Sequence, residues 1–265
     1  MNLFLNIILY ILYLLSALAP LLFLPFFHFN NNDKLSPLIT IPHSLILIYA
    51  FLTINCFLKI CLYELNLRSK DNQKNILESF QNSQLVLIIS FISIFFIFQD
   101  SNIENIVFLQ NQNISSGIGI FNKWGIFLTP ITGIAYFISI YISSMKFPFN
   151  IDDATSSETK GRKWINHIYF IVAFIVGINL FFGGATHLLP FTFSINSITG
   201  IESAIIIIFN ILIKIFCILI IFFLIQRKLL KFSTNEIFLL SWKLFFPLSL
   251  INLIVIMLLK YYLVV

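Results

Sequence analysis

The stretch SAIIIIFNILIKIFCILIIFFLI, Ser203–Ile225, is almost wholly apolar and holds one charged residue, Lys214. A run of about 20 mainly apolar residues is long enough to cross the hydrocarbon core of a bilayer as an α-helix. The stretch therefore predicts a membrane-spanning helix with a lysine near its middle.

The composition extends this prediction to the whole chain. Hydrophobic residues make up 59% of the 265 residues, and charged residues only 10%, whereas a soluble domain carries roughly 25% charged residues. A soluble core cannot bury that much apolar surface, so we expect lipid to be the solvent. Segments of about 10 residues with alternating character, which indicate a membrane barrel, are not seen. The predicted fold class is an all-α integral membrane protein.

Six other stretches resemble 203–225 in length and character. The seven together predict about seven transmembrane helices in a single transmembrane domain, residues 1–265, without an internal repeat. The six are 3–27, 43–65, 83–99, 118–144, 167–188 and 239–263.

The basic residues predict the orientation. With seven spans, the loops near 66–82, 145–166 and 226–238 share one side with the N-terminus, and the opposite loops hold only Lys34 outside the helices. Loops rich in Lys and Arg stay on the cytoplasmic or matrix side, so we expect the N-terminus on that side. The residues that carry the asymmetry are Arg68, Lys70, Lys74, Lys146, Lys160, Arg162, Lys163, Arg227, Lys228 and Lys231.

Ionisable residues at membrane depth are costly and are therefore candidates for function. No acid lies one helical turn from Lys214, at 210 or 218. Lys214 is then either bonded to a neighbouring carbonyl or subunit, or part of a functional path. Lys59 and Glu64 lie toward the basic end of their segment, and we expect Lys59 to snorkel to the interface, as Lys243 can near a helix start.

The histidines and cysteines do not indicate a metal or haem site. The four histidines fall near segment ends, and the three cysteines lie inside apolar segments without CxxC spacing. Such cysteines are typical of buried small apolar residues.

Four blocks of sequence carry a family resemblance. The loop MKFPFNIDDATSS (145–157) places a rigid apolar Phe-Pro-Phe before two acids, and WGIFLTP (124–130) precedes it. NLFFGG (179–184) follows, and Lys214 then leads to LSWK (240–243) and FPL (246–248). In order and spacing these blocks resemble subunit 1 of NADH:quinone oxidoreductase (respiratory complex I) and its bacterial counterpart.

The resemblance implies a non-redox membrane subunit of a proton-pumping translocase, without catalytic activity of its own. It would form the membrane-side part of the quinone cavity and link the peripheral arm to the proton-translocating membrane arm. The implied cavity and docking residues are Lys146, Phe147, Pro148, Phe149, Asn150, Asp153 and Glu158, and the implied proton-relay candidates are Lys214, Lys243 and Glu64.

The resemblance also implies the chemical setting. The chain alone would bind no cofactor, and ubiquinone would be the substrate at a shared site. The partners would be the quinone-site subunits of the peripheral arm, the neighbouring membrane-arm subunits and membrane lipids, with no nucleic acid. The location would be the mitochondrial inner membrane, or alternatively a bacterial inner membrane.

Departures from the family pattern are equally specific. The family's first span and the loop after it have no counterpart, so the chain resembles a split subunit, as in ciliate mitochondria, whose first helix a separate small chain supplies. Family charges are replaced at several positions, including Gln81, Ile89, Thr155, Ser157 and Phe174.

Three alternatives stay open at this point. The first is the related membrane subunit of an energy-converting hydrogenase, and the second is a structural subunit that has lost the proton route. The third is a secondary transporter, for which Pro130 and Gly133 interrupt a segment, although no second half repeats the pattern.

Overall fold

The computed structural model describes residues 3–25, 36–64, 70–111, 123–144, 160–185, 201–226 and 232–263. These residues form helices and connecting turns without a β-strand among them, which confirms the all-α membrane class. The elements are α1 (Leu3–Leu18), η1 (Ala19–Phe23), α2 (Ser44–Glu64), α3 (Lys70–Phe98), α4 (Ile103–Gln110), α5 (Gly125–Leu128), α6 (Pro130–Ser143), α8 (Lys160–Phe181), α9 (Ile201–Gln226), α10 (Thr234–Leu240), η2 (Ser241–Phe245) and α11 (Phe246–Leu263).

Each of the seven apolar stretches contains helix. Three helical segments are long and apolar enough to cross a membrane, and a fourth candidate is the bent pair α3–α4. Three shorter apolar helices accompany them: Ile7–Phe23, Pro130–Ser143 and Ile208–Leu224. The number of spans and their direction stay predictions.

Helix boundaries differ from the apolar stretches where polar helix formers flank them. Helix α3 begins at Lys70, so most of the predicted loop 66–82 is helical, and α8 begins at Lys160 rather than near 167. Lys, Gln and Glu have high helix propensity. A helix can therefore continue past the end of its apolar part.

The bend between α3 and α4 has a local cause. Gln99 has a positive φ of 54°, and the axes of the two helices differ by 63°. Asn102 then caps α4, its side chain accepting a hydrogen bond from the Glu104 amide at 3.1 Å. A non-glycine residue with positive φ ends a helix, and an Asn cap starts the next one.

A second break separates α5 from α6, where the sequence places Pro130. Thr129 has φ −140° and ψ 68°, outside the helical region, and Pro130 occupies the first turn of α6. The Thr129 amide and hydroxyl both donate to the Gly125 carbonyl oxygen, at 2.8 and 2.9 Å. Because proline has no N–H, it is tolerated only in that first turn.

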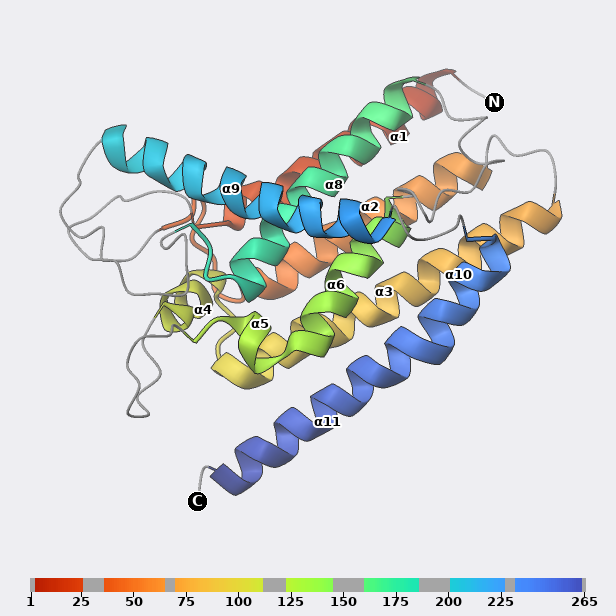
Figure 1. The fold of residues 1–265 in the computed structure, drawn as a ribbon. Coiled ribbons are helices and arrows are strands. Elements are labelled where there is room, and N and C mark those ends of the chain that lie inside the picture. The colour runs from red at the N-terminus through yellow and green to blue at the C-terminus, as the bar shows by residue number, and fades with distance from the viewer. Residues whose placement is uncertain are drawn as a thin grey trace.

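Helix α8 is the central helix of the bundle. Of the apolar window in Gly161–Phe181, 67% is buried, against 11% for Glu236–Tyr262. Helices α1, α6 and α9 pack on α8, while α11 packs on α3 and α6 (Figure 1). The remaining faces of α9 and α11 expose Ile, Leu and Phe side chains, as lipid-facing surfaces do.

The helix ends that adjoin the Lys- and Arg-rich loops lie on one side of the bundle. Figure 1 shows the starts of α1, α3, α8 and α10 and the ends of α2, α6 and α9 toward the same side of the view. The sequence places its Lys- and Arg-rich loops at these ends. The helix ends that flank these loops therefore lie on one side of the bundle, and the orientation in the membrane stays a prediction.

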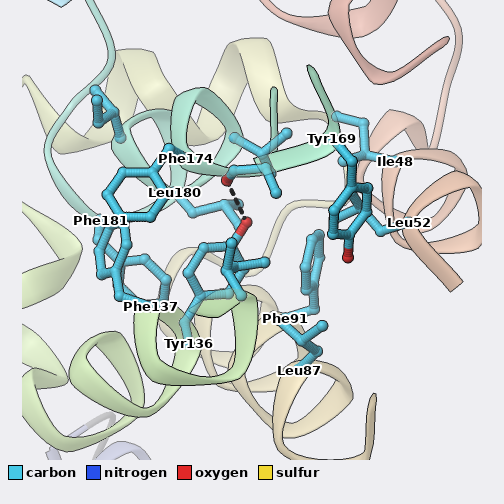
Figure 2. Close-up of a cluster of buried hydrophobic side chains, with 14 of the residues drawn as sticks. Ile48, Leu52, Leu87, Phe91, Tyr136, Phe137, Tyr169, Phe174, Leu180 and Phe181 are labelled. Carbon is cyan, nitrogen blue, oxygen red and sulfur yellow. Dashed lines mark hydrogen bonds between the residues drawn. The ribbon is translucent and has the colours of Figure 1, made fainter. Parts of the chain in front are cut away.

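Aromatic side chains fill the centre between α6, α8 and α3 (Figure 2). Tyr136 and Phe137 of α6 pack against Phe181 of α8, with ring centroids 5.4 and 6.4 Å away. The Tyr136 hydroxyl donates to the Ala173 carbonyl oxygen at 2.8 Å, the dashed line in Figure 2. A buried tyrosine normally needs such a partner, so this bond fixes α6 against α8.

Candidate functional site

A buried lysine lies where α9 crosses the C-terminal end of α8. The Lys214 side chain is only 6% exposed. Its ammonium donates to the carbonyl oxygens of Phe182 and Gly184, both at 2.7 Å. It also lies 4.5 Å from the centroid of the Trp124 ring. The carbonyl interpretation of Lys214 therefore agrees with the structure.

The carbonyls are directed at Lys214 by a glycine turn that ends α8. Gly183 and Gly184 have φ values of +67° and +64°, a region that costs other residues roughly 1–2 kcal/mol. The Gly184 amide donates back to the Ile178 carbonyl oxygen at 3.2 Å. The bond spans seven residues, one more than the 6→1 bond of a Schellman motif, and two consecutive left-handed glycines reverse the chain here.

Gln110, the last residue of α4, forms hydrogen bonds that hold this turn in place. Its amide nitrogen donates to the Asn179 and Leu180 carbonyl oxygens, at 3.1 and 2.9 Å. Its amide oxygen accepts from the amides of Gly183 and Gly125, at 2.8 and 3.3 Å. The Gln110 side chain is fully buried. It bonds backbone carbonyls and amides at the end of α8 and the start of α5, groups that helix ends leave without partners inside the helix.

The electrostatics of the site favour a cation. The C-terminal end of a helix carries partial negative charge, which stabilises a nearby cation by about 0.3–1 kcal/mol, and by up to about 2 kcal/mol when partly buried. An aromatic face adds about 0.5–2 kcal/mol. Among the residues with described side chains, no Asp or Glu forms an ion pair with Lys214. Within the described part of the chain, its charge is balanced by carbonyl dipoles and the Trp124 ring, so the site is sensitive to any new charge nearby.

The described contacts of Lys214 include neither of the other two relay candidates. Lys243 lies in η2 with an exposed side chain, as a snorkelling lysine would. Glu64 is the last residue of α2, and its side chain is outside the described part. The predicted cavity and docking residues, from Lys146 to Glu158, all lie in 145–159, outside the described residues.

Lys59 forms a second buried basic site, which the sequence did not predict. The expectation that it snorkels is wrong, because the side chain is 2% exposed and donates to the Ser143 carbonyl oxygen at 2.6 Å. This carbonyl lies at the C-terminal end of α6, where a cation is favoured. The same kind of partner therefore holds both Lys59 and Lys214.

Arg162 and Asn166 of α8 add to this basic end. The Arg162 side chain is 3% exposed, and its Nε donates to the Tyr10 hydroxyl at 2.9 Å. The Tyr13 hydroxyl donates to Asn166. Polar residues on α1 and α8 thus face each other, which a search within single apolar stretches could not reveal.

The position to which the resemblance assigns a glutamate, Phe174, is apolar in this chain. Phe174 is 1% exposed and packs against Phe137, with ring centroids 5.1 Å apart (Figure 2). The Phe170 ring centroid lies 4.7 Å from that of Phe174. Tyr141 and Phe222 close the same cluster, their rings stacked at 4.6 Å. Proton transfer at this depth therefore has no carboxylate at position 174 to use.

A metal centre finds no support in the described residues, among which no group of three His, Cys, Asp or Glu side chains could hold an ion. His43, for example, lies within hydrogen-bond distance of the Ser101 hydroxyl, 2.6 Å from its Nδ1.

Comparison with known proteins identifies the family. The profile of the family described as NADH dehydrogenase matches residues 79–257, more than half of the chain. This range includes Gln110, the glycine turn and Lys214. A search of curated proteins returns no match. The chain therefore belongs to the NADH dehydrogenase family, as a membrane subunit of complex I of the subunit 1 type.

Proposed function

We propose that this chain forms the membrane-side part of the quinone cavity in a proton-pumping NADH:quinone oxidoreductase, and that it links the peripheral arm to the membrane arm. The observation that carries the proposal is the family match over residues 79–257. That range contains both the loop 145–159 and the site of Lys214. Ubiquinone is the proposed substrate, bound at a site shared with other subunits.

The base of the loop 145–159 suits a docking surface. Helix α6 ends at Ser143 and α8 begins at Lys160, on the side of the bundle where α2 ends and α3 begins (Figure 1). Lys59 fixes the end of α6, and Arg162 fixes the start of α8 against α1. Two fixed helix ends give the loop between them firm attachment points, which is what a docking surface requires.

Lys214 is the proposed responding group inside the membrane. Its ammonium is buried, and described carboxylates do not neutralise it. A change of charge at the quinone alters the proton affinity of buried ionisable groups through a medium of low dielectric constant. Lys243 and Glu64 stay relay candidates by resemblance alone.

The proposed location is the mitochondrial inner membrane. The membrane-type helices and the family support a membrane location. The choice of the organelle rests on the resemblance to a split subunit.

Affinity purification of the tagged full chain from native membranes tests the proposal. We expect quinone-site and NADH-oxidising subunits to co-purify, and a photoreactive ubiquinone analogue to label the loop 145–159. Labelling should fall when unmodified ubiquinone competes. Co-purification with a nickel–iron large subunit, or labelling that ubiquinone does not displace, would contradict it.

A further inference from the structure

Three buried polar atoms around the glycine turn have no hydrogen-bond partner in the part of the chain that the structure describes. They are the indole nitrogen of Trp124 and the amide oxygens of Asn111 and Asn179. Trp124 is 5% exposed, and Asn179 is fully buried. A buried polar atom without a partner costs about 1–3 kcal/mol. Three of them at one turn therefore indicate a ligand that all three can bond.

The identity of each atom is fixed by the rest of its side chain. The Asn111 amide nitrogen donates to the Val107 and Gly183 carbonyl oxygens, at 2.8 and 3.0 Å. A flipped amide would place its oxygen against two carbonyls. The Asn179 amide nitrogen likewise donates to the Ile175 carbonyl oxygen at 2.9 Å. The indole nitrogen is a donor only, so the set comprises one donor and two acceptors.

The atoms converge on the two glycines. The position that a Gly183 Cβ would occupy is 2.6 Å from Trp124 Nε1 and 2.7 Å from Asn111 Oδ1. The equivalent position on Gly184 is 2.9 Å from Asn179 Oδ1. Two atoms so close to a single point are near enough for one water molecule to bridge them. The absence of a side chain at Gly183 lets both approach the backbone.

The mixed polarity selects the ligand. A metal cation would be repelled by the indole N–H and by the Lys214 ammonium nearby. An anion would meet two amide oxygens and the carbonyls that already bind Lys214. Water both accepts and donates, and buried waters typically form about three hydrogen bonds with otherwise unsatisfied groups.

We propose that the Gly183–Gly184 turn is an internal hydration site, in which one or two water molecules accept from Trp124 Nε1 and donate to Asn111 Oδ1 and Asn179 Oδ1. The site lies beside the carbonyls that hold Lys214. If the proposed function is correct, it hydrates the surroundings of the responding lysine. The hydration itself does not depend on quinone chemistry.

A density map of the intact complex, at a resolution that shows internal waters, tests the site directly. We expect a peak within hydrogen-bond distance of Trp124 Nε1 and of at least one of the two amide oxygens. The proposal is overturned if the map shows no peak there, or if the indole bonds directly to Asn111 or to another protein group. Neither outcome depends on whether the complex reduces quinone.

Resonance Raman spectroscopy of the indole N–H gives a second readout. Subtracting the Trp124→Phe spectrum from that of the wild type isolates Trp124 from the other tryptophans of the complex, and Trp242→Phe is the control because the Trp242 side chain is 45% exposed. We expect the difference spectrum to show a hydrogen-bonded N–H, and a free N–H would contradict the proposal. If the Trp124→Phe complex does not assemble, the wild-type map still decides.

Discussion

The ammonium of Lys214 lies 2.7 Å from the carbonyl oxygen of Gly184, so a lysine on α9 caps the C-terminal end of α8. The two residues belong to separate segments, and the bond exists only because the glycine turn directs that carbonyl outward. The lysine is therefore both a structural cap and the group of the site most sensitive to a change of charge nearby. Variants must separate these two roles.

Substitution of Lys214 by Met should slow coupled quinone reduction. The variant removes the buried charge and leaves two carbonyls without a donor, each costing about 1–3 kcal/mol if buried. We expect coupled turnover to fall at least about tenfold, the effect of about 1.4 kcal/mol on the barrier. NADH-driven proton uptake in proteoliposomes measures it.

Lys214→Arg tests whether the positive charge alone suffices or the shape of the lysine is also needed. Lys260→Met is the matched control, because Lys260 lies outside the residues that match the family. Arg keeps the positive charge, so the Lys214→Arg complex should assemble better than Lys214→Met. Its proton coupling should recover only in part, because a guanidinium does not release its proton as an ammonium can. Lys260→Met should leave both unchanged. Unchanged rate and pumping in Lys214→Met, in a fully assembled complex, would remove Lys214 from the mechanism.

The sequence predicted some of this site and missed the rest for a physical reason. A lysine inside an apolar helix is visible without a structure because its burial is costly, whereas the glycine pair contributed only as part of the NLFFGG block of the resemblance. The sequence contained no such signal for Gln110, because a glutamine in a short helix is common and its four hydrogen-bond partners lie in other segments. Lys59 was misread because a lysine near a helix end can snorkel or bond a neighbouring carbonyl. Only the position of Ser143 decides between these.

The helices themselves were more predictable than their ends. Each predicted apolar stretch contains helix, but α3 begins earlier, in polar residues of high helix propensity, and Thr129 breaks its segment just before Pro130. Such breaks depend on φ and ψ rather than hydropathy. The arrangement of α8 at the centre depends on contacts between distant segments, which apolar runs do not encode.

Gly184→Ala should destabilise the end of α8. Its φ of +64° is unfavourable for alanine, and the added Cβ would lie 2.9 Å from Asn179 Oδ1. We expect a cost of roughly 1–2 kcal/mol from the backbone alone, seen as a lower apparent unfolding temperature of the purified complex. The control is Gly161→Ala, where the nearest atom, of Tyr10, lies 4.0 Å away. Equal stability of the two variants would contradict the role assigned to the turn.

Gln110→Leu should destabilise the turn at the end of α8, although leucine and glutamine are similar in size. The leucine fills the space but leaves two carbonyls and two amides without a partner, at about 1–3 kcal/mol for each that stays buried. Hydrogen–deuterium exchange of the assembled complex should show faster exchange at the amides of Gly183 and Gly125. Gln110→Glu provides the comparison, because it retains the acceptor and should protect these two amides better than leucine. Equal exchange in both variants would show that the oxygen of Gln110 does not hold the turn.

Phe174→Glu should prevent assembly rather than restore a proton route. The glutamate that the resemblance assigns to this position would enter a cluster of Phe137, Tyr141, Phe170 and Phe222, whose rings all pack on that of Phe174. An unpaired carboxylate in such surroundings either stays protonated or destabilises the helix packing by several kcal/mol. Phe174→Leu is the volume control, and we expect it to assemble with near-normal pumping. The measurement is the amount of assembled complex in native gels, followed by proton uptake. A Phe174→Glu complex that assembled fully and pumped faster than the wild type would show that the aromatic cluster has room and solvation for the acid.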